Sequence, residues 1–147
     1  MIKIKFSKKQ VNLFKKLGIE TIYLFGSHAQ GNPNPLSDFD FGIVLANPEK
    51  YKEKTLDIYL KLYDIFTEIL PKRYLSQRFK LREHEFDIVF LQFTPISFQF
   101  AVIKNGQVLY ERDKENRLKY EEYVIKRKAD LKYFHDLSFK RLLERIG

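Results

Sequence analysis

The sequence predicts an α+β (α/β) fold, because short apolar runs typical of strands alternate with longer helical patterns along its 147 residues. Runs rich in β-branched and aromatic residues predict strands at 19–25, 38–45 and 86–91. Apolar residues at helical spacing predict a long helix over 47–70 and a terminal helix from Asp113 onward. We therefore expect a sheet with helices packed against it.

Shorter elements complete this expectation. A first helix begins near Ser7, and Gly18 stops it. Residues 95–103 resemble a short buried helix, and Asn105-Gly106 forms a turn. Residues 107–110 then predict a short edge strand.

The two long helices carry more apolar residues than one buried face needs. Over 47–70 there are two stripes: Leu56, Tyr59, Leu60, Tyr63, Phe66 and Leu70 in one, and Ile58, Leu62, Ile65 and Ile69 in the other. Such a helix is either deeply buried or partly reserved for a partner, and burial is the commoner outcome. In the terminal helix the stripe shifts near Asp136, which predicts a bend or break. We expect its Tyr120, Tyr123 and Tyr133 to pack in the core rather than meet a partner or a base.

Composition narrows the class of protein. The net charge is +8, from 27 Lys and Arg against 19 Asp and Glu, so the surface attracts nucleic acid, nucleotides or an acidic protein. There is no cysteine, which excludes disulfides and thiolate metal sites. No apolar run approaches the roughly 18 residues of a membrane span. The N-terminus lacks the apolar stretch of a signal peptide, so we expect a cytoplasmic protein with no membrane partner.

One constellation indicates chemistry. The first strand ends in Gly26-Ser27, and ten residues later Asp38 and Asp40 open the second strand. Acids at positions i and i+2 of a strand point to the same face. Carboxylates are costly beside apolar residues unless something pairs with them, and paired carboxylates suit a hard divalent cation that carries phosphates. The pattern therefore predicts chemistry on a nucleoside triphosphate.

A third acid lies in the next predicted strand. Asp87 has apolar neighbours on both sides, whereas Glu85, which shares its face, stands at the polar edge of the run. We prefer Asp87, and Glu85 remains its competitor. Three converging carboxylates from Asp38, Asp40 and Asp87 would hold one or two Mg²⁺ ions. Asp87 can also accept the proton of an acceptor hydroxyl.

The remaining candidates would contact the nucleotide. Gly26 allows close approach of the backbone to a phosphate, and Ser27 adds a hydroxyl donor at the start of a helix. Ser37 and Gln30 could add hydrogen bonds, although solvated positions account for them equally well, and His28 is better explained as a surface residue of the first helical turn than as a contact of the triphosphate. Five basic side chains between 72 and 82 fit either phosphate binding or a solvated loop.

Taken in order, these residues resemble the nucleotidyltransferase superfamily that includes DNA polymerase beta. Its mark is Gly-Ser, a ten-residue gap, Asp-x-Asp and a distal third acid, matched here by Gly26, Ser27, Asp38, Asp40 and Asp87. The surrounding residues 26–31 and 36–40 are also similar to the compact minimal nucleotidyltransferases (MNT). The resemblance spans about residues 20–110. It implies a nucleotidyltransferase fold with a small mixed sheet, a catalytic domain over 1–112 and a helical extension over 113–147 packed on it as one structural unit.

The resemblance also implies a function. Many MNT proteins are antitoxins paired with a helical HEPN RNase toxin, and they transfer AMP from ATP to a tyrosine of that toxin. On this basis we expect a Mg²⁺-dependent protein adenylyltransferase with ATP as substrate and a HEPN-type toxin as partner. Two alternatives stay open: a small molecule or an RNA end as acceptor, and neutralisation of the partner by binding alone.

Overall fold

In the computed structural model, residues 4–26, 39–70 and 86–146 are described. Four strands form one mixed sheet in the order β3-β2-β1-β4, with β1 antiparallel to both β2 and β4 and β2 parallel to β3. The strands are β1 (Ile19–Phe25), β2 (Phe39–Leu45), β3 (Phe86–Phe90) and β4 (Gln107–Glu111). The predicted sheet, its strands and the edge position of β4 are confirmed.

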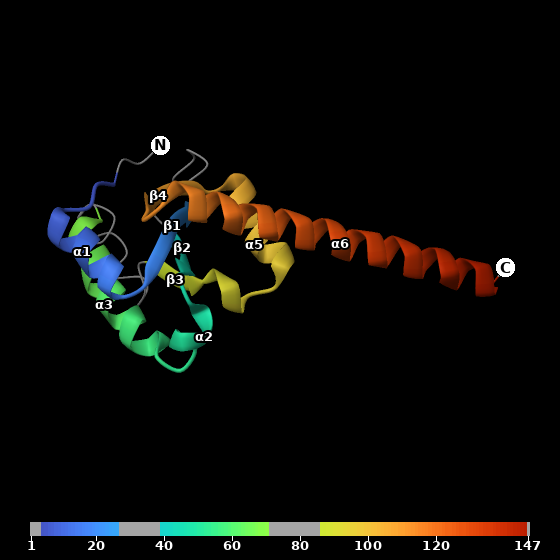
Figure 1. Ribbon diagram of the computed structural model, residues 1–147, viewed down its shortest axis with the longest axis horizontal. Helices are drawn as coiled ribbons and strands as arrows, with labels where there is room; N and C mark the ends of the chain where they lie inside the picture. The colour runs from blue at the N-terminus through green and yellow to red at the C-terminus, as the bar shows by residue number, and fades with distance from the viewer. Residues whose placement is uncertain (1–3, 27–38, 71–85, 147) are drawn as a thin grey trace, which may run out of the picture.

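Helices cover both faces of this sheet (Figure 1). The helices are α1 (Lys8–Lys16), α2 (Pro48–Tyr51), α3 (Thr55–Ile69), α5 (Ile96–Asn105) and α6 (Lys114–Ile146), with a 3₁₀ turn at Leu91–Phe93. The larger core joins α1 and α3 to one face of the sheet, and the smaller core joins α5 and α6 to the other. β2 shows the division clearly, since Phe41 and Ile43 enter the larger core and Val44 enters the smaller one.

Local chemistry explains where several elements begin. The side chain of Ser7 accepts a hydrogen bond from the backbone N–H of Gln10, and the side chain of Gln10 accepts one from the N–H of Ser7, so α1 begins with a capping box. Gly18 ends this helix with a φ of 74° and leads directly into β1. Past the end of β3, the side chain of Gln92 donates to the carbonyl and accepts from the N–H of Leu45, which pairs the last residue of β2.

The predicted continuous helix over 47–70 is wrong, because α2 and α3 are separated by a turn at residues 52–54. Tyr51 packs against the larger core, and the three residues after it, Lys52, Glu53 and Lys54, are charged and exposed. No apolar side chain therefore holds this stretch on the core, and the N–H of Lys54 closes a tight turn on the carbonyl of Tyr51 at 2.9 Å.

The expected burial of both stripes is also wrong for part of α3. Its Ile58, Leu62, Ile65 and Phe66 are buried, while Leu56 and Leu60 are 67% and 53% exposed. One sheet face can accept only one side of a helix, so Leu56 and Leu60 of the first stripe are left to solvent.

The predicted bend near Asp136 is wrong as well, since α6 runs unbroken for 33 residues. It contains neither Gly nor Pro, and ion pairs one turn apart, such as Glu122 with Lys126, support it. The expectation that its tyrosines enter the core holds only for Tyr120, which is half-buried, because Tyr123 and Tyr133 are exposed. In the described part of the chain, no helix combines the length and apolar character needed to cross a membrane.

Candidate active site

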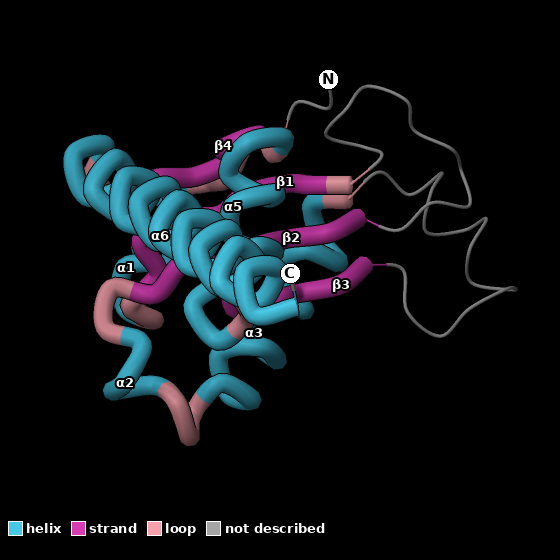
Figure 2. Tube along the Cα trace, turned by 90° about the vertical axis from the view of Figure 1, so that its right-hand side faces the viewer, coloured by secondary structure: helices cyan, strands magenta, loops and turns pink. Residues whose placement is uncertain are grey.

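Three of the predicted site residues lie side by side at one end of the sheet. Asp40 of β2 pairs in register with Phe25 of β1 on one side and with Asp87 of β3 on the other. Gly26 follows Phe25 directly. Figure 2 shows the ends of β1, β2 and β3 that carry these residues meeting at the same edge. The sheet order therefore brings together positions separated by up to 61 residues of sequence.

Asp40 and Asp87 share the face of the sheet that α5 and α6 cover. Side chains alternate along a strand, so Asp40 is on the same side of β2 as Val44, which packs in the smaller core. Asp87 is likewise on the same side of β3 as Val89, which packs against that core. Because the two acids are paired in parallel register, their side chains leave the sheet in the same direction. Asp40 is half-buried and Asp87 is exposed.

Gly26 is tied to Asp40 by geometry. Its φ is 81°, in the left-handed region that favours glycine, and a Cβ atom there would lie 2.4 Å from Oδ2 of Asp40. Any larger residue would therefore displace this carboxylate. The sequence predicts that Gly26 lets the backbone approach a phosphate closely. The structure adds a second reason for a glycine here, since the β1–β2 register places the carboxylate of Asp40 too close to leave room for a Cβ atom.

The rest of the predicted constellation lies outside the described residues. This applies to Ser27, Ser37 and Asp38, to Glu85 as the alternative third acid, and to His28, Gln30 and the basic residues at 72–82. Within the described ranges no group of three or more acidic or histidine side chains is placed to hold a metal ion. The participation of Asp38 beside Asp40 and Asp87 thus stays a prediction.

One aromatic wall of this end of the sheet was missed by sequence reasoning. Phe98 of α5 meets the ring of Phe25 edge-on, with centroids 5.7 Å apart, and Phe25 is the register partner of Asp40. The pattern at 95–103 predicted a buried helix, yet Phe98 keeps 38% of its surface exposed. No local signal identifies this residue, because its place depends on α5 packing on the same face as the acids.

A cavity at the other end of β1 is distinct from the acids. It measures about 280 Å³ and is lined by Glu20, Thr21, Ala46, Gln92 and Tyr120, among others. Its walls come from the first residues of β1 and the region just past β2, whereas Asp40 pairs with the last residue of β1. We therefore place the candidate active site at the edge formed by Gly26, Asp40 and Asp87.

A curated relative matches most of the chain. The protein adenylyltransferase MntA of Aphanizomenon flos-aquae (strain 2012/KM1/D3) is 28% identical over 132 residues, which cover 88% of this chain and 83% of the relative. The aligned region therefore includes most of the described residues.

Solved structures and a family model agree on the fold. A toxin–antitoxin structure with AMP-PNP matches with a TM-score of 0.56 and 16% identity, covering 90% of this chain and 94% of that one. The MNT antitoxin in complex with tri-AMPylated Shewanella oneidensis HEPN toxin gives a TM-score of 0.51 and 15% identity, covering 92% and 93%. The model of the polymerase beta nucleotidyltransferase family matches residues 8–115. The chain therefore belongs to the polymerase beta nucleotidyltransferase family.

Proposed function

We propose that the protein transfers AMP from ATP to a tyrosine hydroxyl of a cognate HEPN-type toxin and thereby acts as its antitoxin. The observation that carries this proposal is the in-register pair of Asp40 and Asp87 next to Gly26, in a chain of the nucleotidyltransferase family. The likeness to an adenylyltransferase MntA and to an MNT antitoxin seen with an AMPylated toxin supports the choice of acceptor.

The described residues fit a Mg²⁺ site. Adjacent strands are about 4.8 Å apart, so the carboxylates of Asp40 and Asp87 leave the sheet close enough to share ions. Both supply the hard oxygen ligands that Mg²⁺ prefers, and Asp38 would complete the set. Bound Mg²⁺, with two ions possible, supplies charge stabilisation for the triphosphate and for the attacking and leaving oxygens.

The residues of this chain would bind the nucleotide, orient its triphosphate and accept the proton of the acceptor hydroxyl. Gly26, Ser27 and Ser37 would hold the nucleotide phosphates, and Asp38 with Asp40 would orient the triphosphate. The tyrosine oxygen then bonds to the α-phosphorus, the bond from that phosphorus to the bridging oxygen breaks, and pyrophosphate leaves with the electron pair. Asp87 would accept the phenolic proton.

Transfer of label from α-labelled ATP to the co-expressed toxin tests this function. We expect Asp40→Asn to lower the transfer rate by about 10³-fold or more, because an amide cannot replace a metal-binding carboxylate. Asp57→Asn is the matched control, since Asp57 is exposed on α3, on the opposite side of the sheet. Asp87→Asn should also abolish transfer and Glu85→Gln should not. Undiminished labelling by Asp40→Asn would overturn the proposal.

Neutralisation by binding alone is the second candidate, favoured by the exposed apolar side chains of α6. The same Asp40→Asn variant separates the two functions when toxin RNase activity is measured. If AMP transfer silences the toxin, the variant binds it and leaves it active. If binding silences the toxin, the variant neutralises it as well as the unmodified chain does.

A further inference from the structure

The second half of α6 projects away from the rest of the molecule (Figure 1). We call residues 131–146 the α6 arm. The last fully buried residue of α6 is Val124, and large apolar side chains of the arm are exposed. These side chains are Leu131, Tyr133, Phe134, Phe139, Leu142, Leu143 and Ile146. A cluster of exposed apolar side chains of this size is typical of an interaction site, so the arm is a candidate for contact with another molecule.

Most of these side chains lie on the same face of α6 as Val124, which is buried nearer the start of the helix. At 100° per residue, Leu131 and Leu142 lie almost in line with Val124, and Phe139 and Ile146 lie within about 60° of it. Val124 is fully buried, and Tyr120, one turn before it on α6, packs against the smaller core that contains Val102 of α5. The arm thus continues a surface that packs on protein, beyond the point where the described residues of this chain cover it.

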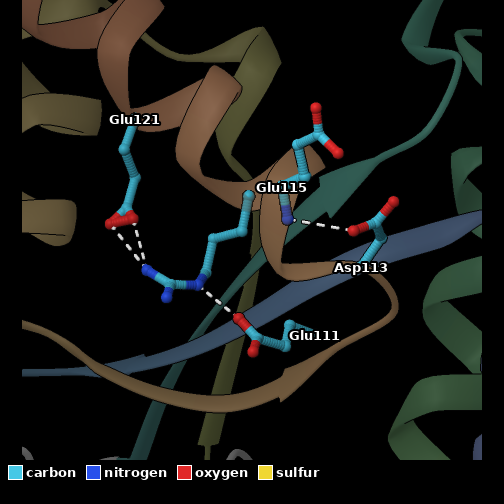
Figure 3. A network of polar contacts seen from close by, with 5 residues as sticks. Glu111, Asp113, Glu115 and Glu121 are labelled. Atoms are coloured by element: carbon cyan, nitrogen blue, oxygen red, sulfur yellow. Dashed lines mark hydrogen bonds and ion pairs between the residues drawn. The ribbon is translucent and has the colours of Figure 1, made fainter.

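The base of α6 is held firmly, which fixes the direction of the arm. Arg117 donates to Glu111 of β4 and, at 2.7 Å, to Glu121 one turn further along α6. Figure 3 shows Glu111 and Glu121 converging on this position. The hydroxyl of Tyr120 donates to Gln99 of α5 at 2.8 Å. Hydrogen bonds from the first turns of α6 to β4 and α5 therefore hold the arm in one orientation relative to the sheet.

The charge of the arm distinguishes between a second copy of this chain and a different protein as its binding partner. The arm carries four Lys and Arg side chains against two acidic ones. Two copies laid arm against arm would bring these like charges together, whereas a partner edged with Asp and Glu would be complementary. The α6 arm also leaves the sheet on the face that carries Asp40 and Asp87. A protein held along the arm would therefore stand on the side of the catalytic acids.

We propose that the α6 arm binds the acceptor protein through an apolar surface of that protein edged with acidic side chains. This inference rests on the proposed function, because it assigns the protein acceptor of that reaction to a second surface, separate from the acids. Docking along the arm would supply affinity for the acceptor, while Asp40 and Asp87 act on its hydroxyl.

The test replaces apolar side chains of the arm with glutamine, which keeps the helix because its helix propensity is good. The triple variant Phe139→Gln, Leu142→Gln and Ile146→Gln should raise the KM for the co-expressed HEPN-type toxin at least tenfold and leave kcat within about twofold. Tyr133→Gln is the matched control, because Tyr133 is 64% exposed on the opposite side of the same helix. It should leave both constants unchanged.

Binding measured by calorimetry in the Asp40→Asn background separates this inference from the proposed function. There the triple variant should raise the Kd at least tenfold although no transfer takes place. An unchanged Kd and KM would overturn the inference and leave the proposed transfer intact. Toxin that binds through the arm but never receives AMP would overturn the function and leave the arm intact. If sedimentation instead shows a dimer that the triple variant dissociates, with toxin binding unchanged, the arm joins two copies and the inference is wrong.

Discussion

Gly26 meets two constraints at the residue scale. Its backbone is left-handed, and its missing side chain leaves room for the carboxylate of Asp40 on the neighbouring strand. Gly18, at the other end of β1, is also left-handed, and a Cβ there would meet the ring of Tyr51. The two glycines therefore share a left-handed backbone that strains any other residue, and they differ in which side chain an added methyl group would displace.

This difference gives a prediction about transfer activity. Gly26→Ala and Gly18→Ala should each lower the free energy of unfolding by about 1–2 kcal/mol, since both force alanine into the left-handed region. Only Gly26→Ala should also lower kcat, by about tenfold or more, because it displaces Asp40. Urea unfolding and label transfer measure the two effects. Equal loss of kcat in both variants would show that strain alone, and not the position of Asp40, limits the reaction.

The site also shows which roles of single residues can be predicted from the sequence and which cannot. Asp40 and Asp87 were predicted to converge because each interrupts an apolar strand, and their parallel register brings them together. The second role of Gly26 was not predicted, because it depends on the β1–β2 pairing rather than on neighbouring sequence. Phe98 was missed for a similar reason, since only the packing of α5 brings it to Phe25.

At the scale of elements, α6 lies over β1 and buries tyrosine hydroxyls between them. Burial, and then the negative charge of Glu121, raise the pKa of Tyr23 far above its ordinary value of about 10. Burial also raises the pKa of Tyr120, with Glu121 again the next cause. Both hydroxyls therefore stay protonated in the folded protein at a pH where the unfolded chain loses those protons.

The contact of β1 with α6 should thus weaken in alkali. Below pH 10 both states keep the proton of Tyr23, and above it only the folded state does, so stability is lost as the pH rises, by up to about 1.4 kcal/mol per pH unit. Tyr23→Phe should make the unfolding free energy fall less steeply between about pH 10 and 11.5. Chemical unfolding at several pH values measures the slope. Equal slopes in Tyr23→Phe and the unmodified protein would contradict the assignment of this pH dependence to Tyr23.

Element ends were predictable where local chemistry sets them, and element continuity was not. Ser7 and Gly18 bound α1 as expected, through a capping box and a left-handed residue. The break between α2 and α3 has no Gly or Pro to announce it, and it arises because three charged residues find no core to pack on. The stripe shift near Asp136 suggested a break because it was interpreted as a change in packing, whereas this part of α6 packs on nothing within the described chain.

At the scale of the whole molecule, the sheet and its helices form one packed unit from which the α6 arm extends. The predicted division at residue 112 falls just before α6 begins at Lys114, and it stays a prediction. Sequence periodicity shows that a helix has an apolar face, but it does not show whether the same chain covers that face. This is why Tyr123 and Tyr133 were expected in the core and are exposed instead.

Truncation tests whether the arm is dispensable for folding. A chain ending at residue 130 keeps Val124 and the hydrogen bond from Tyr120 to Gln99, and the described residues that it loses, 131–146, are all exposed or half-buried. We expect its unfolding free energy to stay within about 1 kcal/mol of the full chain, because little apolar area is lost from the core. A chain ending at residue 118 loses both anchors and should be destabilised by several kcal/mol. Thermal unfolding of the full chain and the two truncated chains measures their stability. Calorimetry with the toxin should then show that the 130-residue chain, although folded, no longer binds it. If that chain fails to fold, the arm is part of the folding unit, and its apolar side chains contribute to stability rather than to docking.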